Sequence, residues 1–354
     1  MGNSTDIFES VNKHRGQIMG LAAVWVFVFH VRNELGLFGE IPFLSRAEFY
    51  CNTFGFCGVD IFLLLSGWGL YHAINKHSLK DFYIRRFRRL FLPFFAVVFA
   101  KALYGHWDIL RYVKALTGWT FLTENVYEPI WFIPSIALLY LFFPLYRFVF
   151  EKFSNKYVFT GAAIALWYAL AVLGTMISPR TDIYLFINRI PVFMVGVLCG
   201  WMTYNKKKIS GIVPWIVLSA MLVAGFVLMN NVLFEGWHFL LPEPRNGLPA
   251  FLIGISMCFL SGKLFNLLDK VKVIQKAYGF IGKMSLEFYV VQEIILYSLY
   301  MEVYFSGSGF NLHLLVFITL LLALGGGYIL YLIETVISKK MDGKPVFTAP
   351  TKKK

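Results

Sequence analysis

Long apolar runs recur along the whole of this 354-residue chain and leave few folds open to it. Each run approaches or exceeds the ~20 residues with which an α-helix crosses the hydrocarbon core of a bilayer, where backbone groups must satisfy one another. The pattern predicts an all-α fold, a polytopic transmembrane helical bundle of about ten spans. The expected spans cover residues 16–31, 51–74, 90–105, 131–150, 158–178, 186–203, 211–232, 247–268, 278–300 and 312–337.

Charge is scarce in this chain, and its placement predicts a topology. Only 15% of the residues are charged, against 58% that are hydrophobic, and the formal net charge is +13. Of the 33 lysines and arginines, 25 fall in alternate connecting segments and the adjoining span ends. The positive-inside rule places those segments in the cytoplasm, together with both termini. The excess of basic residues is therefore explained by membrane topology. We expect membrane lipid as a partner and no nucleic acid.

The chain divides into one large domain and a short tail. We expect a membrane domain over residues 1–340 and a basic, disordered cytoplasmic tail over 341–354. The N-terminal residues lack a cleavable signal pattern, so the first apolar run is expected to stay as a span. The cysteines show no C-x-x-C or Cys/His spacing, so we expect packing residues, no disulfide framework and no metal. They are Cys51, Cys57, Cys199 and Cys258.

A basic cluster precedes the third apolar run. It consists of Arg85, Arg86, Arg88 and Arg89, and spacings of three and four residues bring several of these guanidinium groups to one helix surface. Such a cluster can hold phosphates bidentately. It can equally well serve only to fix the orientation of the chain in the membrane. Charge alone leaves both interpretations open.

Two ionisable residues lie inside the first two apolar runs. His30 lies near the outer end of the first, and its imidazole titrates near neutrality, as a base for a hydroxyl must. Asp60 lies in the outer half of the next run, where an aspartate at bilayer depth costs ~2.5–3.5 kcal/mol. We expect Asp60 to orient His30. The alternatives are a histidine that caps its helix near water and an aspartate paired structurally with another polar group.

Polar residues also follow one stripe of the span at 278–300. Polar side chains on a membrane helix face the bundle interior, where they either join helices or line a cavity. The stripe contains Ser285, Tyr289, Gln292 and Glu293.

Further polar and aromatic residues lie near the span ends. Arg189 can bind a substrate anion, but we favour the interpretation that it snorkels to the interface. The expected outer segments at 105–130 and 234–247 are rich in aromatic and acidic residues. Those residues suit either a sugar site or anchoring at the membrane interface.

Several of these segments carry patterns that resemble one family. Residues 58–67 read GVD-x-F-x-x-x-SG, and residues 85–93 read R-R-x-R-R-L-x-x-P. Residues 131–134 read WFIP, with Tyr140 beyond them. In order and spacing these motifs resemble acyltransferase family 3. Its members are integral-membrane enzymes that place acetyl or other acyl groups on cell-surface sugars.

The resemblance assigns roles to residues of the first and ninth spans. The family's first helix carries an arginine and, after ten intervening residues, an essential histidine, which the run GLAAVWVFVFH places at His30. The arginine position holds Met19, and Arg15 one turn earlier is its candidate substitute. The family motif S-x-x-x-Y-x-x-H has Gln292 at its histidine. A glutamine can orient a substrate but cannot accept its proton.

The resemblance also implies a reaction and a location. Ile136 and Ala137 replace an acidic pair of the O-antigen acetylases, so the resemblance is closer to the branch of sugar and exopolysaccharide O-acetyltransferases. It implies transfer of an acyl group, acetyl in the simplest case, from acyl-coenzyme A to a hydroxyl of a cell-surface or lipid-linked glycan. The implied location is the cell inner (plasma) membrane.

In this reaction the arginine cluster attracts the coenzyme's phosphates, and His30 acts as general base positioned by Asp60. The residues expected to bind substrate are Arg15, Trp131, Tyr289 and Gln292.

Two other classes of function fit the same residues. A transporter or flippase of a lipid-linked sugar or anion also needs intramembrane polar groups and basic cytoplasmic sites. However, the two halves show no matching pair of interrupted helices, which transporters with inverted repeats tend to have. A non-catalytic family member that binds acyl-coenzyme A or glycan is the third interpretation, since Met19 and Gln292 depart from the family pattern.

Overall fold

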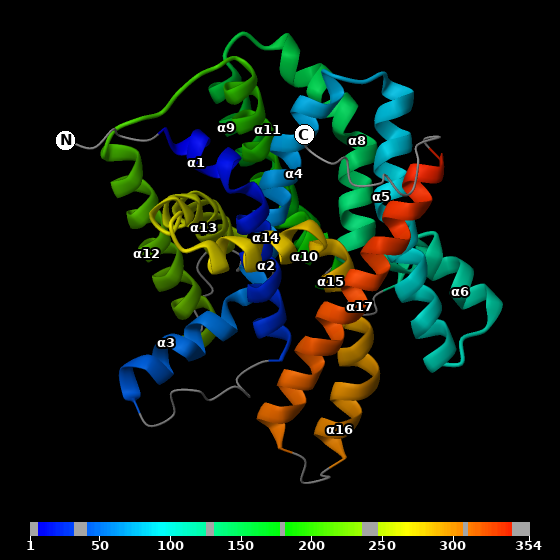
Figure 1. Ribbon diagram of the computed structural model, residues 1–354. Coiled ribbons are helices and arrows are strands. Elements are labelled where there is room, and N and C mark those ends of the chain that lie inside the picture. Colours follow the sequence, from blue (N-terminus) through cyan, green and yellow to red (C-terminus); the bar gives the residue numbers. More distant parts are fainter. Residues whose placement is uncertain are drawn as a thin grey trace, which may run out of the picture.

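The computed structural model describes residues 6–31, 41–124, 131–177, 181–235, 247–306 and 311–341, and every regular element in these ranges is helical (Figure 1). The all-α prediction is confirmed. The first nine α-helices are α1 (Ile7–Lys13), α2 (Arg15–His30), α3 (Pro42–Thr53), α4 (Gly58–Ile74), α5 (Leu79–Tyr104), α6 (Ile109–Leu116), α7 (Trp119–Thr123), α8 (Phe132–Lys152) and α9 (Lys156–Ile177). The remaining ones are α10 (Thr181–Ile187), α11 (Ile190–Tyr204), α12 (Val213–Phe234), α13 (Gly247–Leu267), α14 (Lys272–Lys283), α15 (Ser285–Ile295), α16 (Met301–Phe305) and α17 (Leu312–Met341). A 3₁₀ turn (Gly55–Cys57) precedes α4, and a π-helical turn (Leu296–Tyr300) follows α15.

Within the described ranges, seven helical segments are long and apolar enough to cross a membrane. Each coincides with one of the predicted spans to within a few residues. They are Gly55–Ile74, Phe132–Lys152, Lys156–Gly174, Ile183–Tyr204, Val213–Phe234, Gly247–Leu267 and Leu312–Met341.

The other three predicted spans have different shapes. The first is α2, which is helical throughout but has only 16 residues. The second lies in α5, a continuous 26-residue helix whose first half carries the arginine cluster. The third, at 278–300, is not one helix, because α14 ends at Lys283 and α15 begins at Ser285. The expectation of a single uninterrupted helix there is wrong.

The outward surface of several helices is apolar. Leu166 and Leu170 on α9 and Val223 and Val227 on α12 are all more than half exposed. Apolar side chains repeated along a helix surface indicate contact with a membrane or another protein, because exposing them to water is unfavourable. This surface suits contact with lipid chains.

Close helix crossings at glycine hold the centre of the bundle together. A side chain at Gly67 of α4 would meet the carbonyl of Phe193, and one at Gly196 of α11 would meet the carbonyl of Leu64. Small residues let membrane helices approach in this way. The pair Ser66-Gly67 predicts such a close approach of helices, and Gly67 lies at the contact between α4 and α11.

A second crossing joins α14 to the beginning of α2. A side chain at Gly20 would meet the Tyr278 carbonyl, and one at Gly282 would meet the backbone of Gly16. Figure 1 shows α14, in yellow, lying across α2 before the chain turns into α15. The chain breaks at Met284, two residues after this contact.

Replacing Gly282 by alanine is expected to destabilise the folded protein by ~1–3 kcal/mol, the cost of overpacking a close contact. The added carbon would push against backbone, which cannot rotate away as a side chain can. The measurement is thermal unfolding of the purified protein in detergent. Gly16→Ala is the matched control, since nothing lies within 4 Å of a side chain at that position. Equal stability of the two variants would contradict this account of the crossing.

Candidate active site

His30 ends α2 beside α15, and two polar side chains of that helix hold its ring. The Nδ1 atom lies 3.0 Å from Oε1 of Glu293 and 3.1 Å from Nε2 of Gln292. The His30 side chain is 20% exposed, and that of Glu293 is 5% exposed. The hydroxyl of Tyr300 donates to the carbonyl of Val31 at 3.2 Å, which ties the end of α2 to the turn after α15. The histidine therefore faces the interior of the bundle.

The two neighbours suit different tautomers of the ring. Each ring nitrogen of a histidine carries at most one proton, and the amide nitrogen of Gln292 can only donate. With its proton on Nε2, the ring accepts the Gln292 N–H at Nδ1. With its proton on Nδ1, the ring can donate to the Glu293 carboxylate 3.0 Å away, and Nε2 then keeps a free lone pair. A ring in this second tautomer can accept a proton at Nε2.

Asp60 has a different partner from the expected one. Its Oδ2 atom lies 3.6 Å from Nε of Arg189, and the two side chains are 1% and 6% exposed. The helices α2 and α4 are antiparallel, with Gly58 against Ala22, so Asp60 lies level with the middle of α2. About eight residues at ~1.5 Å each separate that level from His30, or ~12 Å along the axis.

The expected contact between Asp60 and His30 is therefore not formed within the described residues. The carboxylate next to His30 belongs to Glu293 and not to Asp60. Asp60 instead forms a structural ion pair with another polar group, which was the alternative interpretation. The physical reason is the helix register, which a single apolar run does not reveal.

Arg189 is buried rather than snorkelling, so the favoured interpretation was wrong. Its Nη1 atom donates to the Leu185 carbonyl at 2.8 Å. The guanidinium lies over the rings of Phe56 and Trp131, 5.6 and 5.3 Å from their centroids. Trp131, expected to bind substrate, thus packs on the Asp60–Arg189 pair at the start of α8.

The four arginines of α5 do not act as one cluster. Arg89 points into the bundle, where Glu287 of α15 and Glu334 of α17 both contact its guanidinium. A second contact joins Arg89 Nη2 to Glu287 Oε2 at 3.1 Å, so the pair is bidentate. Glu287 is fully buried. These carboxylates neutralise Arg89 and make it a poor phosphate ligand.

The other arginines of the cluster lie nearer the surface. Arg85 is exposed, and Arg86 and Arg88 are half-buried. The Arg86 guanidinium stacks on the rings of Phe82 and Tyr140, 5.7 and 5.5 Å from their centroids. The predicted role of Arg85, Arg86 and Arg88 as coenzyme ligands stays a prediction.

Arg15 is placed at the opposite end of α2 from His30. It donates a hydrogen bond to the carbonyl of Leu65 and packs on Gly69, both in α4. The side chain therefore joins α2 to α4, and the predicted role in substrate binding remains a prediction.

A cavity of about 100 Å³ lies between α2, α4, α5, α8 and α15. The Tyr289 ring lines it and lies 6.5 Å from the ring of His30, between centroids. Arg89 lines it as well, so the cavity joins α5 to the surroundings of the histidine. Its polar lining residues are Ser66, Arg89, Tyr140, Ser285 and Tyr289.

The structure thus brings His30, Tyr289 and Gln292 together, and it adds Glu293, which lay on the predicted stripe without a role. The sequence already indicated that Glu293 needs a partner, because an acid inside an apolar span is costly unless it is paired. Glu287 and Glu334 were missed, although each is an acid inside an apolar segment.

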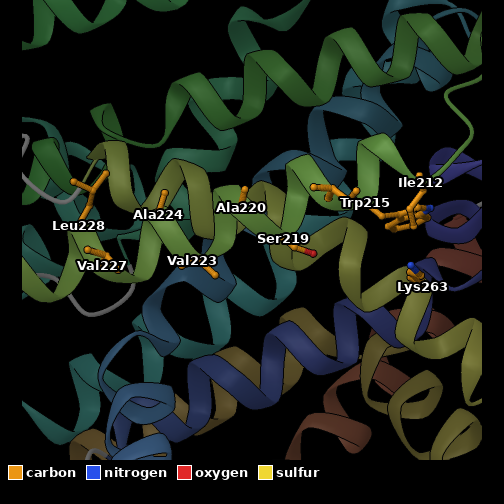
Figure 2. Close-up of a pocket in the computed structure, with 10 residues that line it drawn as sticks. Ile212, Trp215, Ser219, Ala220, Val223, Ala224, Val227, Leu228 and Lys263 are labelled. Atoms are coloured by element: carbon orange, nitrogen blue, oxygen red, sulfur yellow. The ribbon is translucent and has the colours of Figure 1, made fainter.

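A larger groove lies elsewhere and holds none of the predicted site residues. Figure 2 shows this groove of about 890 Å³ along α12, with Lys263 of α13 at one end. The ammonium of Lys263 lies 4.6 Å from the ring centroid of Trp215. The rest of the lining is almost entirely apolar, which suits a lipid-facing surface better than a reaction site.

Some expected residues lie outside the described ranges. They include Tyr127 and Glu128 of the first outer segment, Trp237, His238, Glu243 and Arg245 of the second, and residues 342–354 of the tail. Glu124, which is described, lies 3.5 Å from Lys114 in an exposed ion pair. The sugar-binding interpretation of these segments remains a prediction.

Comparisons with known proteins identify related sequences. A family model described as an acyltransferase domain, that of family 3, matches residues 19–332. A peptidoglycan O-acetyltransferase of Listeria monocytogenes, OatA, is 28% identical over 159 residues. That match covers 36% of this chain and 26% of the relative, so it spans about a quarter of the relative's length. No solved structure matches the chain.

Proposed function

Since the chain belongs to acyltransferase family 3, we propose that it is a membrane-bound O-acyltransferase that modifies a hydroxyl of a cell-surface or lipid-linked glycan. The donor is acyl-coenzyme A, and the acyl group is acetyl in the simplest case. The similarity to a peptidoglycan O-acetyltransferase supports both a polysaccharide acceptor and an acetyl group. The protein acts in the cell inner (plasma) membrane.

The chain crosses that membrane ten times, with both termini in the cytoplasm. Seven helical segments have the length and composition of spans. The others are α2, α5 and the broken segment from α14 to α16. The distribution of lysine and arginine supports this orientation. It places the arginines of α5 at the cytoplasmic face and His30 toward the outside.

The observation that carries the proposal is His30 itself, which lies beside Glu293 and beside Tyr289, a residue that lines the same cavity as Arg89 of α5. A donor bound by Arg85, Arg86 and Arg88 from the cytoplasm extends its thioester into this cavity. An acceptor glycan approaches from the outer side. The two substrates then meet at one imidazole.

The transfer step uses the tautomer of His30 that has its proton on Nδ1, toward Glu293, and a free lone pair on Nε2. Nε2 takes the proton of the glycan hydroxyl while the hydroxyl oxygen attacks the thioester carbonyl carbon. The carbon–sulfur bond breaks, and coenzyme A leaves as a thiol with the proton that His30 returns. Glu293 stabilises the imidazolium that forms between these two steps. Tyr289 and Gln292 help to orient the reacting groups, while Asp60 supports the fold through Arg189.

The test uses purified protein in detergent with acetyl-labelled acetyl-coenzyme A and oligosaccharides released from the cell envelope. An acyltransferase forms labelled ester and releases free coenzyme A at matching rates. A transporter or a non-catalytic binding protein forms no ester. Release of coenzyme A without any glycan-bound label would contradict the proposal.

Replacing Glu293 by glutamine is expected to lower kcat by about 10²-fold, because the ring loses the carboxylate that stabilises the imidazolium formed during transfer. The KM values for both substrates are expected to change little, since Glu293 contacts the histidine and not the substrate. Steady-state kinetics measure this split. Glu302→Gln is the matched control, an acid on the following helix that bonds Tyr104 at 3.3 Å. Equal kcat values for the two variants would remove Glu293 from the mechanism.

A further inference from the structure

A second cavity lies beside the central one, which Tyr289 lines next to His30. It is a groove of about 490 Å³ between α5 and α8, and the turn between α6 and α7 forms part of its wall. One stripe of α5 lines it from Tyr83 to Phe94. These eleven steps along a helix span ~16 Å. The groove is therefore long and narrow, and it runs along the axis of the bundle.

The groove and the central cavity share two lining residues, Leu90 and Tyr140. Leu90 comes from α5 and Tyr140 from α8, so each contributes one surface to both spaces. The groove and the cavity therefore lie next to each other at these two side chains. The cavity in turn is lined by Tyr289, which lies next to His30.

The chemistry at one end of the groove favours an anionic ligand. Arg86 lines the groove, and its guanidinium stacks on Phe82 and Tyr140 without a carboxylate partner in the described part of the chain. Stacking holds the guanidinium plane and leaves its N–H groups for a phosphate. Arg89, one turn away, contrasts with it because two carboxylates already neutralise it.

We propose that this groove binds the pantetheine arm of the coenzyme donor, with a phosphate at Arg86 and the thioester passing between Leu90 and Tyr140. The proposal rests on the proposed function, because it assigns the site of the donor in that reaction. Arg86 and Leu90 are four residues apart, or ~6 Å along α5, so the arm turns inward soon after its phosphate. The hydroxyls of Tyr83 and Thr117 line the groove and can accept hydrogen bonds from the amides of the arm.

The chain of a membrane phospholipid is the competing occupant, because most of the lining is apolar. Two features favour the coenzyme arm. The hydrocarbon chain of a lipid forms no hydrogen bonds with the hydroxyls in the wall. Its binding also does not require a neighbouring central cavity. The experiment below separates the two occupants.

The test fills the groove at Ala137, a residue of α8 that lines the groove and not the central cavity. Ala137→Trp is expected to weaken the binding of coenzyme A at least about tenfold, measured by calorimetry on the purified protein in detergent. The KM for acetyl-coenzyme A rises in parallel, and the KM for the oligosaccharide stays unchanged. Leu145→Trp is the matched control, on the same helix, exposed and not part of the groove wall.

Ala137→Met provides a smaller change if the tryptophan variant does not fold, and it is expected to weaken binding by a smaller factor. If Ala137→Trp and Leu145→Trp bound coenzyme A equally well, the proposal would be overturned. It would also be overturned if native mass spectrometry showed that Ala137→Trp loses a bound phospholipid and retains coenzyme A. If the unaltered protein binds coenzyme A at this groove but forms no ester, the donor site stands and the proposed function fails.

Discussion

Replacing His30 by alanine is expected to lower kcat for acyl transfer by ~10²–10⁴-fold, the contribution of a positioned general base. Of the two residues that contact the ring, Gln292 accepts no proton, and Glu293 contacts Nδ1 of the ring rather than the substrate in the proposed mechanism. The folded protein is expected to accumulate normally, since the ring lies at a helix end and is partly exposed. The measurement is labelled ester formed per mole of purified protein.

His72→Ala is the matched control for this substitution. His72 lies near the other end of the bundle, where its Nε2 atom is 2.9 Å from the Thr203 hydroxyl. Its loss removes a histidine and a hydrogen bond without touching the proposed site, so activity should stay close to that of the unaltered protein. If His30→Ala transferred acyl groups as fast as His72→Ala at equal protein amounts, the catalytic assignment would be wrong.

Breaking the Asp60–Arg189 pair is expected to have the largest effect on stability. Asp60→Asn keeps the shape of the side chain but leaves the buried guanidinium of Arg189 without a counter-charge. Removing one member of a buried pair typically costs ~3–5 kcal/mol. Urea or thermal unfolding in detergent measures the loss.

The double variant Asp60→Asn/Arg189→Met is the decisive comparison for this pair. It removes both charges, so no unpaired charge remains, and replacing a buried pair with neutral groups is often close to neutral. Its stability is therefore expected to exceed that of Asp60→Asn alone. If the double variant were less stable than either single variant, mutual neutralisation of the two charges would not account for their burial.

The sequence revealed the class of fold because apolar length is a local property. Seven of the expected spans recur as helices with nearly the same bounds. The break at Met284 was not foreseen. It follows a crossing in which Gly282 meets the backbone of Gly16, far away in the chain. Such a helix crossing produces no periodic pattern of residue types in the sequence.

The same distinction holds for the site. Composition showed that Asp60 needs a partner, but helix register decides that the partner is Arg189 and not His30. His30 was found from its place in an apolar run and from the family resemblance. Glu293 lay on the correct stripe, yet four polar residues shared that stripe, and the packing of α15 against α2 brings two of them, Gln292 and Glu293, to Nδ1 of His30. Arg89 was grouped with its neighbours because its two acidic partners come from distant helices.

The central claim is that one imidazole joins a donor from the cytoplasm to an acceptor outside. Proteoliposomes of known orientation test it most directly, with labelled acetyl-coenzyme A supplied on one side and envelope oligosaccharides on the other. Labelled ester is expected only when the donor is on the side of the α5 arginines and the acceptor is opposite, and only with His30 present. Ester formed solely when both substrates share one side, or formed equally by His30→Ala, would contradict the account.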